Sequence, residues 1–240
     1  MDSAAPSPRK RHALQLFEGL PARYDRVGAA MSFGQDPRWR RAMVDAVQPT
    51  PGQRILDVAT GTGMVALALA ARGAEVTALD QSEAMLAVAR GRAAPASGRI
   101  EFVTGEAEHL PFEDGSFDAL TFTYLLRYVD NPAQTLTELA RVVRPGGRIG
   151  MVEFGVPHNP LLKRLWRVHT RVGLPLMGRV VSPAWYEVGR FLGPNIERFH
   201  EEHPDLSTLW TEAGISLVTQ RSMSFGAGLV MWGVRDGDSA

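Results

Sequence analysis

A glycine turn between two apolar runs limits this chain to a small set of folds. The run RILDVA, residues 54–59, is typical of a buried strand, and the run MVALALAAR, residues 64–72, is typical of the start of an apolar helix. Gly61 and Gly63 lie between them. Because glycine has no Cβ and tolerates positive φ, such a turn lets the backbone approach a ligand closely. The sequence therefore predicts a strand, turn and helix unit with a ligand at the turn.

The next apolar run adds a carboxylate to this unit. Residues 75–79 form a second predicted strand, and Asp80 follows it directly. At the end of a neighbouring parallel strand, a carboxylate can accept both hydroxyl groups of a ribose. The sequence therefore predicts a nucleoside site at the carboxyl edge of a parallel sheet.

Charge indicates which nucleoside fits this site. A dinucleotide places its pyrophosphate at the helix N-terminus, where backbone N–H groups attract anions. Here Asp57 lies four residues before Gly61, and no Lys or Arg occurs between Ile55 and Ala71, so an anion would be repelled. S-adenosyl-L-methionine instead carries an ammonium and a sulfonium group, which suit an acidic strand end. We therefore expect this molecule as the cofactor, with Asp57, Gly61, Gly63 and Asp80 among its binding residues.

Composition excludes several other classes of protein. The chain has 240 residues, is 45% hydrophobic, carries a formal net charge of +0 and contains no cysteine. Balanced charge gives no electrostatic case for binding nucleic acid, and without cysteine there are no disulfides, thiolate metal sites or cysteine nucleophiles. We predict no metal site. No apolar stretch reaches the ~18 residues of a membrane span, and the first residues lack the apolar core of a signal peptide. We expect a cytoplasmic protein that is at most peripheral to a membrane.

Predicted strands and helices alternate along the first two thirds of the chain. After a disordered tail at 1–8, residues 9–240 are expected to form a single domain, with an N-terminal helical cap at 9–48 that contains helices at 9–20 and 37–47. The strands are expected at 54–59, 75–79, 100–103, 118–124 and 148–154, and the helices between them at 64–72, 82–91 and 132–143. This alternation predicts a doubly wound, mostly parallel α/β sheet.

The chain after residue 154 departs from this alternation. Residues 155–200, rich in Pro, Arg and aromatic residues, are expected to form an irregular substrate-side insertion with a helical segment inside it. A helix at 205–213 follows, and the runs 215–223 and 228–234 flank a predicted hairpin loop.

Motifs beyond the glycine turn indicate a family. They are ARYD at 22–25, MSFG at 31–34, GEAEHLPF at 105–112, RVVRPGG at 141–147 and Glu153-Phe154. Together with the turn, they resemble class I S-adenosylmethionine-dependent methyltransferases, and more closely the ubiquinone/menaquinone biosynthesis C-methyltransferase family. The similarity covers residues 14 to 234, and it implies a seven-stranded Rossmann-like methyltransferase sheet whose last hairpin is antiparallel.

The resemblance also implies which side chains contact the cofactor. They are Tyr24, which closes over it, Thr62 in the glycine loop, Asp80 at the ribose, Glu106 and Ala107 along the adenine edge, and Thr123 beside the methionine portion. Gln81 and Met85 follow Asp80, and Met85 would face either the core or the adenine ring.

The chain departs from the usual pattern of the family close to the reacting centre. Thr60, Met64 and Tyr128 stand where Gly, Asp and Asn are usual, and Leu125-Leu126 replace Phe-Gly. These positions bear on the acceptor rather than on the cofactor.

The favoured acceptor is a small hydrophobic, ring-hydroxylated molecule such as a prenylated quinol, methylated on carbon. Loss of a hydroxyl proton strengthens the ring carbon as a nucleophile, but a phenol has a pKa of about 10. Arg127, which matches an arginine at the substrate mouth of the family, is predicted to favour the phenolate as the catalytic residue. His169, Tyr186 or a water held by Arg127 could accept the proton.

Three alternative functions remain open at this point. The same class of enzyme could methylate oxygen or nitrogen of a secondary metabolite or phospholipid. A nicotinamide-dependent oxidoreductase could use the same glycine turn, although Asp57 disfavours it. A cofactor-binding protein without catalysis is the third. The oligomeric state is also open, with a homodimer as one candidate.

Residues 161–181 carry an unusual charge pattern. Five basic residues lie between Phe154 and Tyr186, with no acid among them, namely Lys163, Arg164, Arg167, Arg171 and Arg179. Interleaved with leucines and valines, they could form a basic amphipathic helix on an anionic membrane surface, a lid over the site, or a helix packed by its apolar face.

Overall fold

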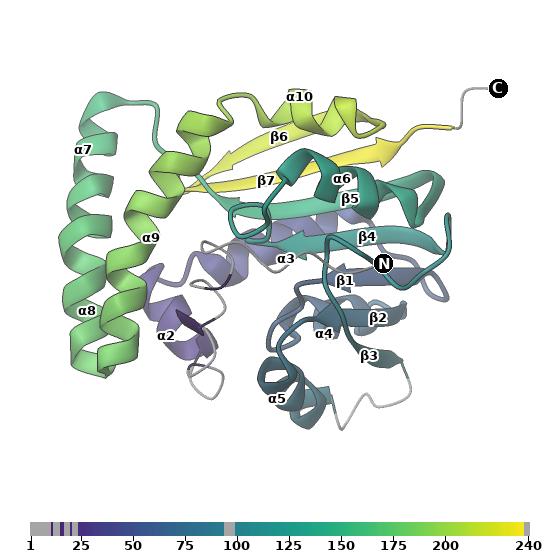
Figure 1. Ribbon diagram of the computed structural model, residues 1–240, viewed down its shortest axis with the longest axis horizontal. Coiled ribbons are helices and arrows are strands. Elements are labelled where there is room, and N and C mark those ends of the chain that lie inside the picture. Colours follow the sequence, from purple (N-terminus) through teal and green to yellow (C-terminus); the bar gives the residue numbers. More distant parts are fainter. Residues whose placement is uncertain (1–10, 12–14, 17–19, 21–23, 94–98, 238–240) are drawn as a thin grey trace.

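A seven-stranded sheet forms the centre of the computed structural model, which describes residues 11, 15–16, 20, 24–93 and 99–237. Its strand order within these residues is β3-β2-β1-β4-β5-β7-β6 (Figure 1). The strands are β1 (Arg54–Val58), β2 (Glu75–Asp80), β3 (Ile100–Thr104), β4 (Phe117–Thr123), β5 (Val143–Phe154), β6 (Ile215–Met223) and β7 (Gly228–Arg235). Strands β1 to β5 pair in parallel, and β7 pairs antiparallel with both β5 and β6. The predicted fold class is confirmed.

Helices cover both faces of this sheet. They are α3 (Asp36–Val47), α4 (Met64–Ala70), α5 (Glu83–Ala93), α6 (Pro132–Arg141) and α10 (Leu206–Glu212). In β1, Ile55 packs in the cluster that α3 and α4 cover, whereas its neighbour Leu56 packs in the cluster that α6 and α10 cover. Both side chains are fully buried. Strands buried on both faces have continuous apolar sequences, which is why the run at 54–59 was recognisable.

The sheet order creates a binding crevice beside β1. The chain passes from β1 to β2 on one side and later enters β4 on the other side, so the connections after β1 and β4 leave in opposite directions. Ligands of doubly wound sheets bind at such a switch point, outside the carboxyl ends of the strands. The glycine loop, which joins β1 to α4, lies at this point.

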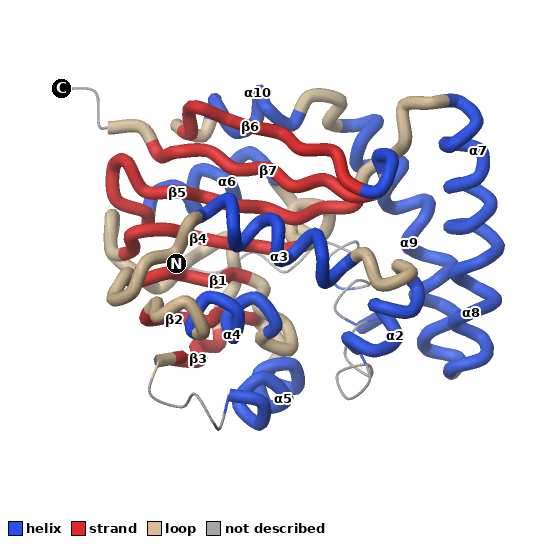
Figure 2. The backbone as a smooth tube through the Cα atoms, turned by 180° about the vertical axis from the view of Figure 1, so that it is seen from behind, coloured by secondary structure: helices blue, strands red, loops and turns tan. Residues whose placement is uncertain are grey.

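A helical column, residues 160–202, stands beyond the carboxyl ends of β4 and β5 (Figures 1 and 2). It consists of α7 (Pro160–Val168), the π-helical turn η3 (His169–Gly173), α8 (Leu174–Val181) and α9 (Pro183–Glu202). The predicted helical insertion is therefore confirmed, but it is helical over most of the stretch 155–200, which was expected to be largely irregular. Prolines occupy the first turns of α7 and α9, where the missing N–H costs no hydrogen bond.

Glycines in the helical column serve close packing rather than loops. A Cβ on Gly178 would lie 2.2 Å from the carbonyl oxygen of Trp185, and a Cβ on Gly189 would lie 2.6 Å from the carbonyl of Leu174. Helices α8 and α9 can therefore approach each other only because these positions lack side chains. The prediction of an irregular stretch rested on Pro, Arg and aromatic residues and did not anticipate this packing.

Several smaller expectations also changed. Helix α2 (Tyr24–Met31) was not predicted, and β5 begins at Val143 instead of residue 148, with an irregularity in its pairing with β4. The hairpin is confirmed, with a short turn, η4 (Ser224–Gly226), between β6 and β7. The predicted tail at 1–8 lies outside the described residues, as does most of the helix expected at 9–20. Within the described part of the chain, no helix combines the length and apolar character needed to cross a bilayer.

Candidate active site

A cavity of about 880 Å³ lies at the switch point, between the carboxyl edge of the sheet and the helical column. Its walls come from the glycine loop, the end of β2, helices α2 and α3, the segment after β4, and the helical column. Ten of the residues predicted for the site line it, and they are Tyr24, Gly61, Thr62, Asp80, Gln81, Met85, Ala107, Thr123, Arg127 and His169. Asp57, Gly63 and Glu106 are not part of its lining, and neither is Tyr186.

The two glycines of the loop have different tasks. Both adopt positive φ, 56° at Gly61 and 80° at Gly63. A Cβ on Gly61 would meet no protein atom within 4 Å, because this position faces the cavity. A Cβ on Gly63 would lie 3.0 Å from the Cβ of Ala89 in α5. Gly61 therefore leaves room for a ligand, whereas Gly63 lets α5 pack against the start of α4.

Asp80 holds the loop and also faces the cavity. One carboxylate oxygen accepts a hydrogen bond from Gly61 N at 2.7 Å, and the other accepts from Ser82 N at 2.8 Å. Burial raises the pKa of this carboxyl group, although these backbone bonds oppose the rise. Because each carboxylate oxygen can accept a second bond, Asp80 can still receive ribose hydroxyls as predicted.

Asp57 lies below the glycine loop and not in the cavity. Its side chain is almost fully buried and accepts hydrogen bonds from the hydroxyls of Thr60 at 2.6 Å and Thr121 at 2.7 Å. Burial raises its pKa to about 6, against the effect of those two hydroxyls. The expected direct contact between Asp57 and the cofactor does not fit this placement. Through these two hydrogen bonds Asp57 connects the glycine loop to β4. Its carboxyl group lies beneath the loop and does not line the cavity.

Helix α2 is joined to the glycine loop by an acidic residue that sequence reasoning did not single out. The hydroxyl of Thr62 donates to both carboxylate oxygens of Asp25, at 2.7 and 2.9 Å, and Arg92 pairs with the same carboxylate. Tyr24, one residue earlier, is partly buried beside Trp185 of α9. The motif ARYD was the signal that could have identified Asp25.

A second group of polar residues lies where α3 meets the end of β4. Arg40 donates to Asp36 at 3.0 Å and to the hydroxyl of Thr123 at 3.2 Å, and the hydroxyl of Tyr124 also donates to Asp36. Tyr124 has a φ of 56°, which is unusual for a residue with a bulky side chain and typical of functional sites. Apart from Thr123, sequence reasoning did not predict this network, because its contacts join α3 to residues 83 and 88 positions further along the chain.

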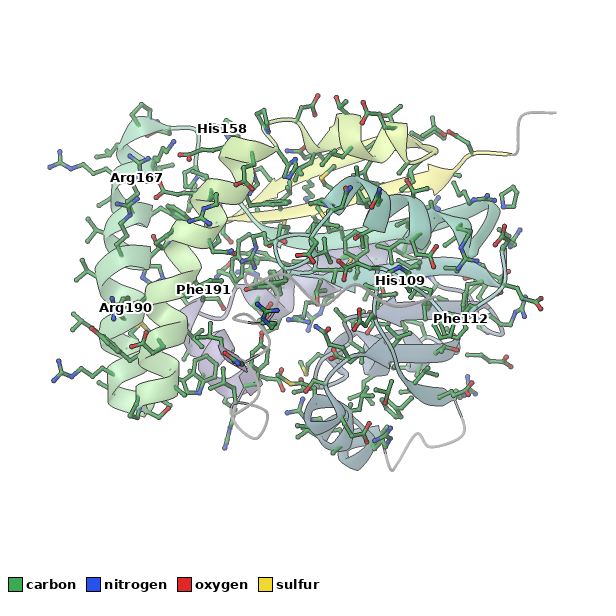
Figure 3. The ribbon with its side chains drawn as sticks, viewed as in Figure 1. His109, Phe112, His158, Arg167, Arg190 and Phe191 are labelled. Atoms are coloured by element: carbon green, nitrogen blue, oxygen red, sulfur yellow. The ribbon has the colours of Figure 1, made fainter. Side chains whose placement is uncertain are left out.

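Arg127 is fully buried in a network of its own. Its Nε donates to Glu153 at 2.7 Å, and its Nη1 donates to Asn195 at 2.6 Å and to the Tyr128 hydroxyl at 3.1 Å. Burial favours loss of the proton, but Glu153 and Tyr128 together more than offset this, and the pKa of Arg127 lies above its ordinary value. Arg127 is thus a permanent cation at the cavity wall. Phe191 of α9 stacks on the Tyr128 ring with centroids 6.3 Å apart, on the sheet side of the helical column (Figure 3).

His169 lines the cavity from the π-helical turn, but its ring nitrogens face protein. Nε2 lies 3.1 Å from the carbonyl oxygen of Met31, and a Cβ on Gly173 would lie 3.0 Å from Nδ1. The ring therefore links α2 to the helical column. Its role as proton acceptor stays a prediction.

The remaining predicted residues lie near the end of β2. Met85 is buried in α5 and also lines the cavity, as do Gln81 and Ala107. Glu106 is exposed and pairs through its backbone with His109, which Figure 3 places over the sheet, away from the helical column.

The charges around the cavity suit a cationic ligand at the glycine loop. Asp25, Asp80 and Glu83 line this end. Arg92 and Arg90 pair with Asp25 and Glu83 but do not line the cavity, so Asp80 is the acid at this end that no described Lys or Arg pairs with. The arginines of the lining, Arg40 and Arg127, come from α3 and from the segment after β4. The sulfonium and ammonium groups of a cationic ligand fit the acidic end at the glycine loop, whereas the negative charge of a pyrophosphate would be repelled there.

Comparison with known proteins agrees with this geometry. A model of the ubiE/COQ5 methyltransferase family matches residues 7–235. The chain belongs to the ubiE/COQ5 methyltransferase family. A demethylmenaquinone methyltransferase from Clavibacter sepedonicus is 40% identical over 222 residues, which cover 92% of this chain and 89% of that protein. The chain is therefore an S-adenosyl-L-methionine-dependent methyltransferase.

Solved structures of other methyltransferases share the fold. A possible histamine N-methyltransferase from Thermotoga maritima has a TM-score of 0.63 at 21% identity and covers 93% of this chain and 100% of its own. A phosphoethanolamine N-methyltransferase from Haemonchus contortus, in complex with S-adenosyl-L-methionine, has a TM-score of 0.58 at 16% identity over 83% of this chain and 53% of its own. Because both structures are less than 25% identical to this chain, the comparison shows only that they share its fold.

Proposed function

We propose that this ubiE/COQ5 methyltransferase methylates a ring carbon of a prenylated naphthoquinol. The cavity chemistry carries the proposal. The helical column contributes the polar residues His169 and Thr170 to the cavity wall. The rest of its contribution is apolar and includes Leu174, Val188, Leu192 and Ile196. Its relatives are named demethylmenaquinone methyltransferases, which supports a naphthoquinol over other ring-hydroxylated acceptors.

The glycine loop and Asp80 would hold the cofactor at one end of the cavity. When bound, S-adenosyl-L-methionine supplies an activated methyl group on its sulfonium. The protein then has to align a nucleophile and exclude water, and orientation of this kind can contribute about 7–11 kcal/mol to catalysis. Tyr24 and Trp185, whose ring centroids are 6.0 Å apart, close the cavity between α2 and α9.

Arg127 and Tyr128 would stabilise the reacting form of the acceptor. A neutral quinol is a weak carbon nucleophile, and its phenolate is much stronger. Arg127 donates a hydrogen bond to the Tyr128 oxygen, which polarises this hydroxyl and makes it a better donor. A quinol oxygen that accepts from this pair would ionise more readily, at about 1.4 kcal/mol for each pKa unit. Transfer of the methyl group to carbon then releases the ring hydrogen as a proton.

Product analysis tests this proposal. Purified protein is incubated with S-adenosyl-L-methionine and a chemically reduced, prenylated naphthoquinone that lacks the ring methyl, and products are examined by mass spectrometry before and after oxidation in air. We expect a gain of one methylene, and we expect the product to reoxidise fully to a quinone, because a C-methylated quinol keeps both hydroxyls.

The controls separate the alternatives. The same naphthoquinone left unreduced should not react, since its ring is not nucleophilic. A product that gains a methylene but cannot reoxidise carries the methyl on oxygen and would overturn the assignment of C-methylation. Methylation of amines only, with no reaction of any reduced quinone, would replace the acceptor class.

A further inference from the structure

The outer face of the helical column is apolar although it faces solvent. Six large side chains there are between 52% and 89% exposed. They form the outer stripe, defined as Leu161, Leu165, Val168, Val172, Leu176 and Val180. Each is three or four residues from the next, so they share one side of the helix. The opposite side packs into the protein through Trp166, Thr170, Leu174 and Gly178. Exposed apolar surface of this extent usually marks a contact with a partner.

The π-helical turn keeps this stripe straight. In a regular α-helix each residue advances by about 100°, so a step of four residues advances the stripe by about 40°. Three such steps in succession, from Val168 to Val180, would rotate it by about 120°. The π-helical turn at His169–Gly173 holds one residue more than an α-helical turn, so each of its residues advances by less than 100°. This smaller advance cancels most of the rotation of the stripe. The stripe therefore presents one continuous line along α7 and α8.

Basic residues border the outer stripe. Lys163, Arg164, Arg167, Arg171 and Arg179 lie along the same helices, and residues 155–186 contain no acid. Glu197 of α9 pairs with both Arg167 and Arg171 and so neutralises one of their two charges. Among the described residues, no ion pair involves Lys163, Arg164 or Arg179. The surface is thus apolar along its middle and positive along its border.

We infer that the outer stripe docks this protein on an anionic lipid bilayer. A helix with an exposed apolar face and a basic border is suited to lie in the headgroup region, with its leucines and valines in the acyl chains and its cations among anionic lipids. A second copy of the chain fits less well, because two such faces would bring their positive borders together.

The position of the outer stripe links docking to the cavity. Leu165 belongs to the stripe and also lines the cavity. Phe33 lines the cavity as well, is 71% exposed, and lies with its ring centroid 4.9 Å from that of His169. Figures 1 and 2 show α7 and α8 at the outer edge of the molecule in both views. A bilayer against this edge would face the cavity rim, where a prenylated acceptor could pass from lipid into the site. This consequence rests on the proposed function, whereas docking itself does not.

Vesicle sedimentation tests the docking. The full chain, without cofactor or acceptor, is mixed with vesicles of phosphatidylcholine alone or of phosphatidylcholine with phosphatidylglycerol, at low and high salt. We expect sedimentation with the anionic vesicles, weakened by salt. The triple variant Val168→Gln/Val172→Gln/Leu176→Gln should bind at least tenfold more weakly, because it removes exposed apolar area from the outer stripe. None of the three residues lines the cavity, so the cofactor site should be unaffected. Leu217→Gln, which replaces an apolar residue of β6 that is 77% exposed, should bind as the wild type does.

Two double charge-reversal variants test the contribution of the basic border. Arg164→Glu/Arg179→Glu should reduce binding to anionic vesicles, and Arg38→Glu/Arg41→Glu, on the exposed side of α3, should not. Thermal unfolding and S-adenosyl-L-methionine affinity, unchanged in every variant, show that each protein is folded. If the wild type ignores both kinds of vesicle, or if the triple variant binds like the wild type, docking is refuted. A wild-type dimer that the triple variant abolishes, without vesicle binding, would assign the stripe to a second copy.

These outcomes are independent of the acceptor. Vesicle binding together with inactivity toward every quinol would remove the proposed function and leave docking intact. Activity toward a short-chain, water-soluble quinol with no vesicle binding would refute docking and leave the proposed function intact.

Discussion

Replacing Asp80 by Asn separates the binding of the cofactor from the stability of the fold. The carboxylate accepts hydrogen bonds from Gly61 N at 2.7 Å and from Ser82 N at 2.8 Å. Asparagine keeps one acceptor oxygen and turns an NH₂ group toward the other backbone N–H, so one of these bonds is lost. The ribose loses an ionised acceptor as well. Hydrogen bonds to charged groups contribute about 1.5–3 kcal/mol, and we therefore expect S-adenosyl-L-methionine to bind about 10- to 150-fold more weakly.

Stability should respond differently from affinity. Burial raises the pKa of Asp80, which means that the folded protein disfavours its ionised form. Removing the charge relieves this penalty while it removes a hydrogen bond, and the two effects oppose each other. We expect the free energy of unfolding to change by less than about 1 kcal/mol, as measured by urea titration.

Asp118 provides the matched control for Asp80. It lies at the opposite edge of the sheet and also accepts a backbone hydrogen bond, from Arg54 N at 2.8 Å. Burial opposes its ionisation, but Arg54 N and Arg144 outweigh this and lower its pKa. Asp118→Asn should therefore lower stability and leave cofactor affinity unchanged. Titration calorimetry decides the matter, because wild-type affinity in Asp80→Asn would show that this carboxylate does not hold the cofactor.

Three further predictions concern buried or enclosed polar groups. Asp57 has a folded pKa of about 6, above its ordinary 3.8, so its stabilising contribution is complete below that lower value and is lost as the pH rises through about 6. The unfolding free energy of the wild type should rise by up to about 3 kcal/mol relative to Asp57→Asn between neutral and acidic pH, and parallel pH curves would contradict this. Arg127→Met should cost about 3–5 kcal/mol of stability because it leaves Glu153 buried without its cationic partner, whereas Arg127→Met/Glu153→Gln should recover stability but not turnover. Normal turnover in the double variant, with unchanged cofactor affinity, would remove Arg127 from catalysis. His169→Gln should reduce kcat by less than about tenfold if the ring only links α2 to the helical column, and a loss of 10²–10⁴ in steady-state assays would identify it as the base.

The sheet and the cofactor end of the site were accessible from local sequence. Ile55, Leu56 and Val58 are buried on the two faces of the sheet, which makes the run at 54–59 predominantly apolar, and Gly61 adopts a backbone conformation that few other residues tolerate. Asp80 follows its strand directly, so its place at the sheet edge needed only the strand prediction. Each of these signals lies within a few residues of the feature it indicates.

The role of Asp57 shows where local reasoning stops. Its position at the end of β1 was predicted correctly, but the direction of its side chain depends on Thr121, which is 64 residues away along the chain. Strand residues alternate between the two sides of a sheet, and nothing within the turn reveals which hydroxyl a neighbouring strand supplies. The network of Asp36, Arg40 and Tyr124 was missed for the same reason.

Local sequence by itself determined the doubly wound sheet, the glycine loop and the acidic end of the nucleoside site, because strand burial, positive φ and charge are properties of short segments. Only the tertiary structure decided that a segment rich in Pro and Gly becomes a helical column, since Gly178 and Gly189 are needed where two helices touch. It also decided that Arg127 meets Glu153 and Asn195, and that the outer stripe stays exposed. These features depend on contacts between residues distant in sequence, and such contacts exist only after the chain has folded.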